Sequence, residues 1–142
     1  MSENDYAGDV SPLYAFEILK AEETAELIDV RTKAEWSFVG VPDLSPIGKA
    51  ACFIEWLTYP EMSANPSFLT EVKRVAGDNM DAAIFFVCRS GQRSRNAAIA
   101  ATAAGYTRAY NVEDGFEGPL DTERHRGSAG GWKSSGLPWG QS

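Results

Sequence analysis

One cysteine, Cys88, stands where the pattern of a buried strand gives way to a loop. The six residues before it, 82–87, are all apolar, which suits a strand buried on both faces of a parallel sheet. After the six-residue loop 88–93, the Ala-rich segment 94–105 favours a helix that ends at a glycine. A strand, a tight loop and a helix start direct backbone N–H groups and the positive end of a helix dipole at one point. The sequence therefore predicts a site for a thiolate and for small anions at Cys88.

Three arginines, Arg89, Arg93 and Arg95, follow Cys88 closely. Cysteine is nucleophilic as the thiolate, which neighbouring cations and helix N-termini favour. Arginine stays protonated, so these side chains can bind an oxyanion or stabilise a leaving group but cannot act as bases. The one histidine, His125, lies in a polar tail and is expected at the surface. A Cys–His hydrolase is therefore disfavoured, and a small anionic substrate is expected.

Length and composition limit the classes of protein to consider. A chain of 142 residues with 44% hydrophobic and 23% charged residues is expected to form one globular domain. The net charge of −7 argues against nucleic-acid or acidic-membrane partners, and no apolar stretch is long enough to span a bilayer. The N-terminal residues do not resemble a signal peptide.

The two cysteines do not form a disulfide framework at this length, so a cytoplasmic setting with a free Cys88 is expected. Cys52, within an apolar segment, is expected to be a small core residue. None of these patterns calls for a metal or a cofactor.

The rest of the chain alternates between strand and helix patterns. Residues 1–9 are expected to form a flexible leader and residues 10–142 the domain. Ser11 and Pro12 predict a helix start, and Thr32 with Glu35 predicts a capping box. Strands are expected at 26–31, 50–54 and 108–112, and a loop at 60–66. A further helix is expected to begin with Pro66 and to end at Gly77. This order predicts an α/β fold with a mainly parallel central sheet, helices on both faces, and ligands at the carboxyl ends of the strands.

Four motifs in order resemble the rhodanese family. The loop 88–94, Cys-Arg-Ser-Gly-Gln-Arg-Ser, is similar to the family's active-site loop and precedes the usual Ala-rich helix. Residues 27–31 with Glu35 are similar to the first signature, 110–116 to the last-strand motif, and Trp132 with 136–138 to the C-terminal motif. The resemblance covers about residues 10–139 and implies a single rhodanese-like domain.

This resemblance implies a sulfurtransferase in which Cys88 takes the outer sulfur of a donor such as thiosulfate and becomes a persulfide. The sulfur would then pass to cyanide, a small thiol or a protein thiol. The loop would bind the donor and the persulfide through Arg89, Ser90, Gly91, Gln92, Arg93 and Ser94. Asp29, Arg31 and Glu35 would support the loop through ion pairs or hydrogen bonds. No cofactor, nucleic acid or membrane is implied.

The sequence also departs from the family pattern in two segments. Residues 39–44 lack the histidine that many members have there, which affects the rim of the pocket rather than the catalytic step. Residues 119–131 form an apparent insertion, expected to be a solvated loop, or else a lid or a docking segment for the sulfur acceptor.

Two other functions remain open. A phosphatase or arsenate reductase of the cysteine-loop type needs an arginine six positions after the cysteine, where this chain has Ser94, with Arg93 one residue early and Arg95 one residue late. This spacing favours sulfur over phosphate chemistry. A non-catalytic module that binds a partner through the same fold is the other alternative, although such modules commonly lack the cysteine.

Overall fold

A five-stranded parallel sheet forms the centre of the molecule. In the computed structural model, which describes residues 5–58, 61–118, 122–124 and 130–141, the strand order is β1-β8-β7-β2-β4 and every neighbouring pair is parallel. The strands are β1 (Gly8–Val10), β2 (Glu26–Asp29), β4 (Cys52–Phe53), β7 (Ile84–Val87) and β8 (Ala109–Val112). The predicted α/β fold with a mainly parallel sheet is confirmed.

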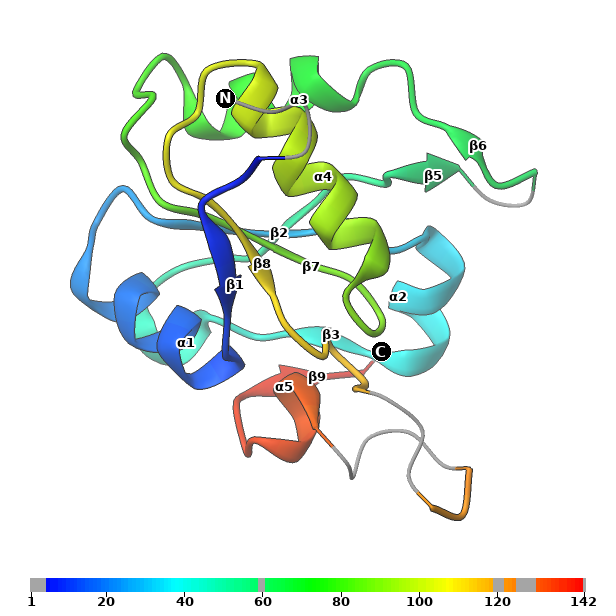
Figure 1. Ribbon diagram of the computed structural model, residues 1–142. Helices are drawn as coiled ribbons and strands as arrows, with labels where there is room; N and C mark the ends of the chain where they lie inside the picture. Colours follow the sequence, from blue (N-terminus) through cyan, green and yellow to red (C-terminus); the bar gives the residue numbers. More distant parts are fainter. Residues whose placement is uncertain (1–4, 59–60, 119–121, 125–129, 142) are drawn as a thin grey trace.

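Helices cover both faces of this sheet (Figure 1). On one face lie α1 (Pro12–Ala21) and α5 (Gly131–Ser134), and on the other lie α3 (Phe68–Ala76) and α4 (Gln92–Ala103). All four residues of β7 are buried, because successive side chains enter opposite cores. Phe85 packs in the core with α1, and Phe86 in the core with α3 and α4.

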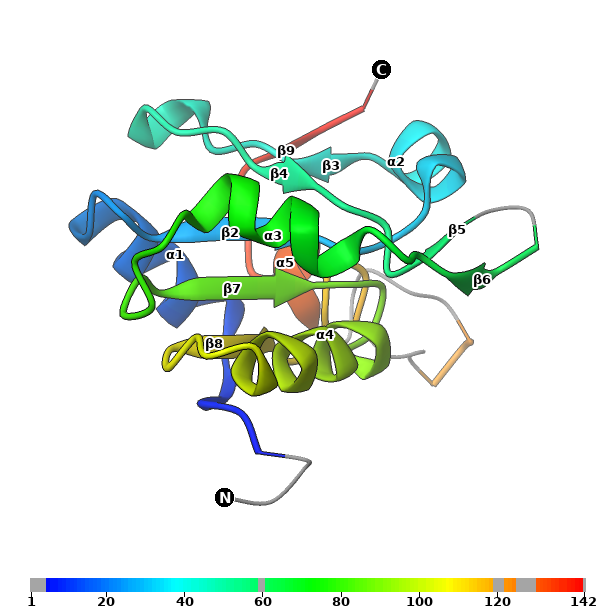
Figure 2. The same ribbon diagram turned by 90° about the horizontal axis from the view of Figure 1, so that it is seen from above.

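Local signals predicted two helix starts correctly. Ser11 caps α1 by accepting a hydrogen bond from the Tyr14 N–H, and Pro12 is the first helical residue. Thr32 and Glu35 form the predicted capping box at the start of α2 (Lys33–Val39). This short helix lies beyond the carboxyl end of β2. In Figure 2 the arrow of β7 points toward the same end of the molecule.

Three boundaries differ from the sequence-based expectation. The expected leader 1–9 overlaps β1, which begins at Gly8 and pairs with β8. The helix expected to open with Pro66 begins at Phe68, because Pro66 lies in the preceding turn and Ser67 is the N-cap. The expected loop 60–66 contributes a strand to a small hairpin of β5 (Leu57–Thr58) and β6 (Ser63–Ala64).

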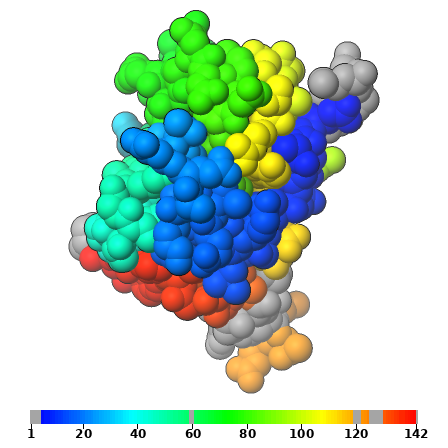
Figure 3. All heavy atoms as spheres, turned by 90° about the vertical axis from the view of Figure 1, so that its left-hand side faces the viewer, coloured from blue at the N-terminus to red at the C-terminus, as the bar shows by residue number. Residues whose placement is uncertain are grey.

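The C-terminal segment packs back onto the domain. Trp132 is fully buried, and β9 (Trp139–Gly140) pairs antiparallel with β3 (Val41–Pro42). A 3-10 turn, η1 (Ser45–Ile47), follows β3. In the space-filling view of Figure 3 the C-terminal segment, coloured red, lies directly beneath the N-terminal segment, coloured blue. Most of the expected insertion 119–131 lies outside the described residues.

Among the helices that the structure describes, none combines the length and hydropathy needed to cross a bilayer.

Candidate active site

Cys88 lies immediately after β7, at the carboxyl edge of the sheet, and is only 1% exposed. The loop that follows is shorter than predicted, because α4 begins at Gln92 rather than after Arg93. Gln and Arg are good helix formers, so the first helical turn absorbs both residues. Gly91 is the N-cap and has a φ of 121°, a conformation that other residues rarely adopt. The chain can thus turn from strand to helix within a few residues of the sulfur.

Two groups of the loop and helix contact the sulfur. The Gly91 N–H donates a hydrogen bond to the Cys88 Sγ at 3.1 Å, and the Ser94 Oγ lies 3.2 Å from the same sulfur. Ser94 is fully buried in α4, whereas Arg89, Ser90 and Gln92 are exposed. A thiolate at this position would face a backbone donor and the positive end of a twelve-residue helix. The arrangement can therefore stabilise a negative sulfur atom.

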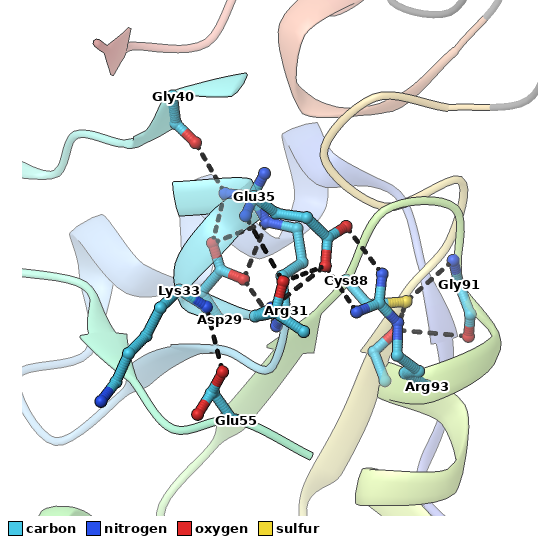
Figure 4. A network of polar contacts seen from close by, with 11 residues as sticks. Asp29, Arg31, Lys33, Glu35, Gly40, Glu55, Cys88, Gly91 and Arg93 are labelled. Carbon is cyan, nitrogen blue, oxygen red and sulfur yellow. Dashed lines mark hydrogen bonds and ion pairs between the residues drawn. The ribbon is translucent and has the colours of Figure 1, made fainter. Parts of the chain in front are cut away.

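Arg93 reaches across from α4 to Glu35 of α2 (Figure 4). Its two terminal nitrogens donate to the two Glu35 carboxylate oxygens at 2.7 and 2.8 Å, and both side chains are more than four-fifths buried. Burial opposes ionisation of Glu35, but the bonds from Arg93 and from the Thr32 N–H outweigh it and lower the pKa of Glu35 to about 2. Glu35 therefore fixes the first turn of α4, and the Arg93 guanidinium already has a carboxylate partner.

We expect the contribution of Glu35 to stability to depend on pH. Its pKa is about 2 in the fold against an ordinary 4.5, so the ionised pair stabilises the protein above about pH 4.5 and this stabilisation is lost as the pH falls toward 2. The shift corresponds to about 3 kcal/mol. Glu35→Gln should be less stable than the wild type at neutral pH, with a difference that shrinks as the solution is acidified. Urea unfolding of both proteins over this pH range measures it, and a constant difference would contradict the expectation.

Asp29 and Arg31 form a fully buried ion pair at the end of β2. The Arg31 Nη2 donates to the Asp29 Oδ2 at 2.7 Å and also to the Gly40 carbonyl at 2.8 Å. The guanidinium lies 4.3 Å from the centre of the Phe116 ring, a cation–π arrangement. The pair thus joins β2 to the start of β3 and to the turn that follows β8.

That turn also supports the loop that follows Cys88 through backbone hydrogen bonds. The Phe116 N–H donates to the Cys88 carbonyl at 2.7 Å, and the Glu117 N–H donates to the Arg89 carbonyl at 3.0 Å. Gly115, with a φ of 63°, lies so close that a Cβ atom would be 2.5 Å from the Cys88 carbonyl oxygen. The motif at 110–116 therefore positions the backbone of the loop, and only glycine fits at position 115.

A pocket of about 580 Å³ opens beside the loop. We call it the Arg89 pocket. Its polar lining includes Arg89, Arg93, Glu35 and Glu117. The remaining lining is mostly apolar and comes from α2 and the hairpin: Thr32, Ala34, Val39, Leu57 and Met62. A molecule with both an anionic group and an apolar part would complement these walls.

The second cysteine has a different environment. Cys52 lies in β4, is partly buried rather than fully in the core, and its Sγ lies 4.0 Å from the Glu26 carboxylate. Burial, and then the Glu26 charge, raise the pKa of the Cys52 thiol. Cys52 is therefore expected to be the less reactive of the two thiols at neutral pH.

Two polar residues behind the loop, Asn111 and Asp9, were not predicted to belong to the site. The Asn111 Oδ1 lies 2.6 Å from the Ser94 Oγ, and the Asn111 Nδ2 donates to the Asp9 Oδ1 at 3.0 Å. Asn111 is 5% exposed. A buried polar residue within the last strand was the available signal, because such a residue needs hydrogen-bond partners. Asp9 gave no signal, since it belongs to the segment expected to be a leader.

No group of three metal-ligating side chains is close enough to hold a metal ion among the residues that the structure describes.

Solved structures resemble this fold over nearly the whole chain. The crystal structure of Rv0390 from M. tuberculosis is 51% identical in sequence, superposes with a TM-score of 0.86, and is matched over 97% of this chain and 100% of that one. The polysulfide-sulfur transferase homodimer of Wolinella succinogenes is 18% identical, with a TM-score of 0.60, over 99% of this chain and 82% of that one. The Wolinella likeness concerns the fold alone.

Curated proteins are also similar to this chain in sequence. The uncharacterized protein RC0915 of Rickettsia conorii is 38% identical over 125 residues, which span 88% of this chain and 90% of that protein. The chloroplastic rhodanese-like domain-containing protein 4 of Arabidopsis thaliana is 27% identical over 125 residues, but these span only 24% of the plant protein. The fold is therefore rhodanese-like. More particularly, residues 7–142 match the model of the STR4 middle domain, and the chain belongs to that family.

Proposed function

We propose that this protein is a sulfurtransferase that carries a sulfane sulfur as a persulfide on Cys88. The observation that carries the proposal is the hydrogen bond from the Gly91 N–H to a buried cysteine sulfur at the start of α4. A backbone donor and a helix N-terminus at a sulfur suit a nucleophilic thiolate and, after transfer, an anionic persulfide. A reducing, cytoplasmic setting is part of the proposal, because the reaction needs a free thiol.

The transfer occurs in two displacements. The Cys88 thiol first loses its proton to water, and the thiolate attacks the outer sulfur of thiosulfate. A new S–S bond forms, the bond between the two sulfur atoms of thiosulfate breaks, and sulfite leaves with the electron pair. Cyanide or the thiolate of an acceptor then attacks the outer sulfur of the persulfide. This step releases thiocyanate or the acceptor's persulfide and restores the Cys88 thiolate.

Arg89 is the residue proposed to bind the anionic donor. It is exposed, lines the Arg89 pocket, and has no carboxylate partner among the residues that the structure describes. Arg93 lines the same pocket, but its guanidinium is held by both oxygens of Glu35. Arg89 can therefore supply a positive charge to the donor without breaking an ion pair. The apolar walls of the pocket suit the carbon chain of an organic thiol acceptor.

Intact-mass measurement tests the proposal. After incubation with thiosulfate and desalting, the mass of the protein should rise by one sulfur atom, and cyanide should remove the addition. Cys52→Ser should show the same gain of mass with thiosulfate and the same loss with cyanide, which would show that the sulfur is not carried by Cys52. A protein that gains no sulfur under conditions where it is folded would refute the sulfurtransferase and leave the binding module as the better interpretation.

Arg89→Ala should weaken the use of thiosulfate mainly through a higher apparent KM, since the positive charge binds the donor rather than forming the new bond. An increase of roughly tenfold corresponds to one charge-assisted hydrogen bond. Arg95→Ala is the matched control, because it removes the same charge from a nearby exposed position whose guanidinium lies over the Tyr6 ring instead. Thiocyanate formation measures both. Equal KM values for Arg89→Ala and the wild type would show that another group binds the donor.

A further inference from the structure

Behind Cys88, a chain of polar contacts runs from the sulfur to the edge strand β1. The Ser94 Oγ lies 3.2 Å from the Cys88 Sγ and 2.6 Å from the Asn111 Oδ1, and the Asn111 Nδ2 lies 3.0 Å from the Asp9 Oδ1. Asp9 and Asn111 are register partners in the parallel pair β1–β8, so their side chains lie next to each other on one face of the sheet. The sheet itself therefore places a carboxylate at the far end of this chain of contacts.

Counting donors fixes the direction of each hydrogen bond. The Asp9 carboxylate can only accept, so the Asn111 amide must present its NH₂ group to Asp9 and its oxygen to Ser94. The Ser94 hydroxyl has two oxygen acceptors within reach, the Asn111 amide oxygen at 2.6 Å and the Gly91 carbonyl at 3.2 Å, and it donates to the nearer one. A hydroxyl has one proton. The Ser94 oxygen therefore faces the Cys88 sulfur with its lone pairs.

Burial makes this assignment firm. Ser94 is 0% exposed and Asn111 is 5% exposed, so turning the Ser94 proton toward the sulfur would leave the buried Asn111 oxygen without its donor. Tyr6 helps to hold the Asp9 carboxylate in this orientation, because the Tyr6 hydroxyl donates to the same Asp9 oxygen at 2.7 Å. Asp9 itself lies at the surface, in contact with water.

We propose that Asp9 and Asn111 are positioning residues that hold the Ser94 proton away from the Cys88 sulfur. This proposal rests on the proposed role of Cys88 as the nucleophile. The Cys88 thiolate that carries no extra sulfur then accepts a hydrogen bond from the Gly91 N–H, but it faces the lone pairs of the Ser94 oxygen. These lone pairs repel the negative charge of the thiolate. In the persulfide the charge resides on the outer sulfur, so the same lone pairs disfavour the loaded form less. The arrangement therefore favours uptake of sulfur over the resting thiolate.

Alkylation of Cys88 by iodoacetamide, a neutral reagent, tests the proposal in a Cys52→Ser background at a fixed, slightly acidic pH. Asp9→Asn removes the acceptor-only group, so the Asn111 amide can turn and donate to Ser94, whose proton becomes free for the sulfur. Alkylation should accelerate roughly three- to tenfold, the effect of about one hydrogen bond. Asn111→Leu removes the nearer of the two acceptors that compete for the Ser94 proton, leaving the Gly91 carbonyl at 3.2 Å, and should also accelerate alkylation.

The decisive comparison repeats Asp9→Asn together with Ser94→Ala. If Asp9 acts through the Ser94 proton, its effect should vanish when the hydroxyl is absent. An acceleration that persists in Ser94→Ala would show that the negative field of Asp9 is responsible, and the proposal would be wrong. Unchanged or slower alkylation in Asp9→Asn and Asn111→Leu would overturn it equally. Because alkylation needs no sulfur donor, failure of the sulfurtransferase proposal would leave this result interpretable.

Discussion

Replacing Cys88 with serine is expected to leave a folded protein that transfers no sulfur. The serine oxygen is close in size to the sulfur and can still accept the Gly91 N–H, so the loop should keep its conformation. A hydroxyl at neutral pH is a far weaker nucleophile than a thiolate and cannot form a persulfide. Both thiocyanate formation and the thiosulfate-dependent gain in mass should fall to the background without enzyme.

Cys52→Ser is the matched control, since it removes the other thiol from a strand at the opposite edge of the sheet from β1. It should retain turnover and the gain in mass. Circular dichroism and urea unfolding should show that both variants are folded. Turnover that survives in Cys88→Ser but disappears in Cys52→Ser would move the site to Cys52 and contradict the assignment.

The second large effect is expected for Asp29→Asn. Asp29 and Arg31 are both 0% exposed, and the carboxylate accepts from the Arg31 Nε as well as from Nη2. Asparagine preserves the shape of the side chain but leaves a buried guanidinium without its counter-charge. Breaking one partner of a buried pair costs about 3–5 kcal/mol, so the free energy of unfolding in urea should fall by that amount.

An exposed ion pair provides the control for this measurement. Glu22 and Arg108 also form a bidentate pair, but each side chain is about one-third exposed. Glu22→Gln should therefore lower the free energy of unfolding by less than about 1 kcal/mol. If Asp29→Asn cost no more than Glu22→Gln, the buried pair would not be an important contribution to stability, and its role would be confined to holding the Gly40 segment.

Features that depend on neighbouring residues could be predicted from the sequence. Ser11 and Pro12 specify the start of α1, and Thr32 with Glu35 specifies the capping box, because each involves groups within one helical turn. The position of Cys88 at the end of a buried strand was predicted for the same reason. Its unbroken apolar run, 84–87, is a property of the strand alone.

Features that depend on distant partners could not be predicted in this way. Glu35 was expected to support the loop, but it and Arg93 are separated by 58 residues, so the sequence does not show that its partner is an arginine expected to bind the donor. Asp9 and Asn111 meet only because β1 pairs with β8. The start of α3 was misplaced for a local reason, since Asn65 accepts hydrogen bonds from the Ser67 and Phe68 N–H groups and so holds Pro66 in a turn before the helix.

The strand order has a consequence for the kinetics of folding. Asp9 and Asn111 are separated by 102 residues, so pairing β1 with β8 closes a loop of that length. Contacts between residues so distant in sequence are slow to form, because the entropy of closing the intervening loop is lost before the pairing energy is gained. The polar contacts behind Cys88 should therefore be among the last to form during refolding, after the core around β7 and α4 has become compact.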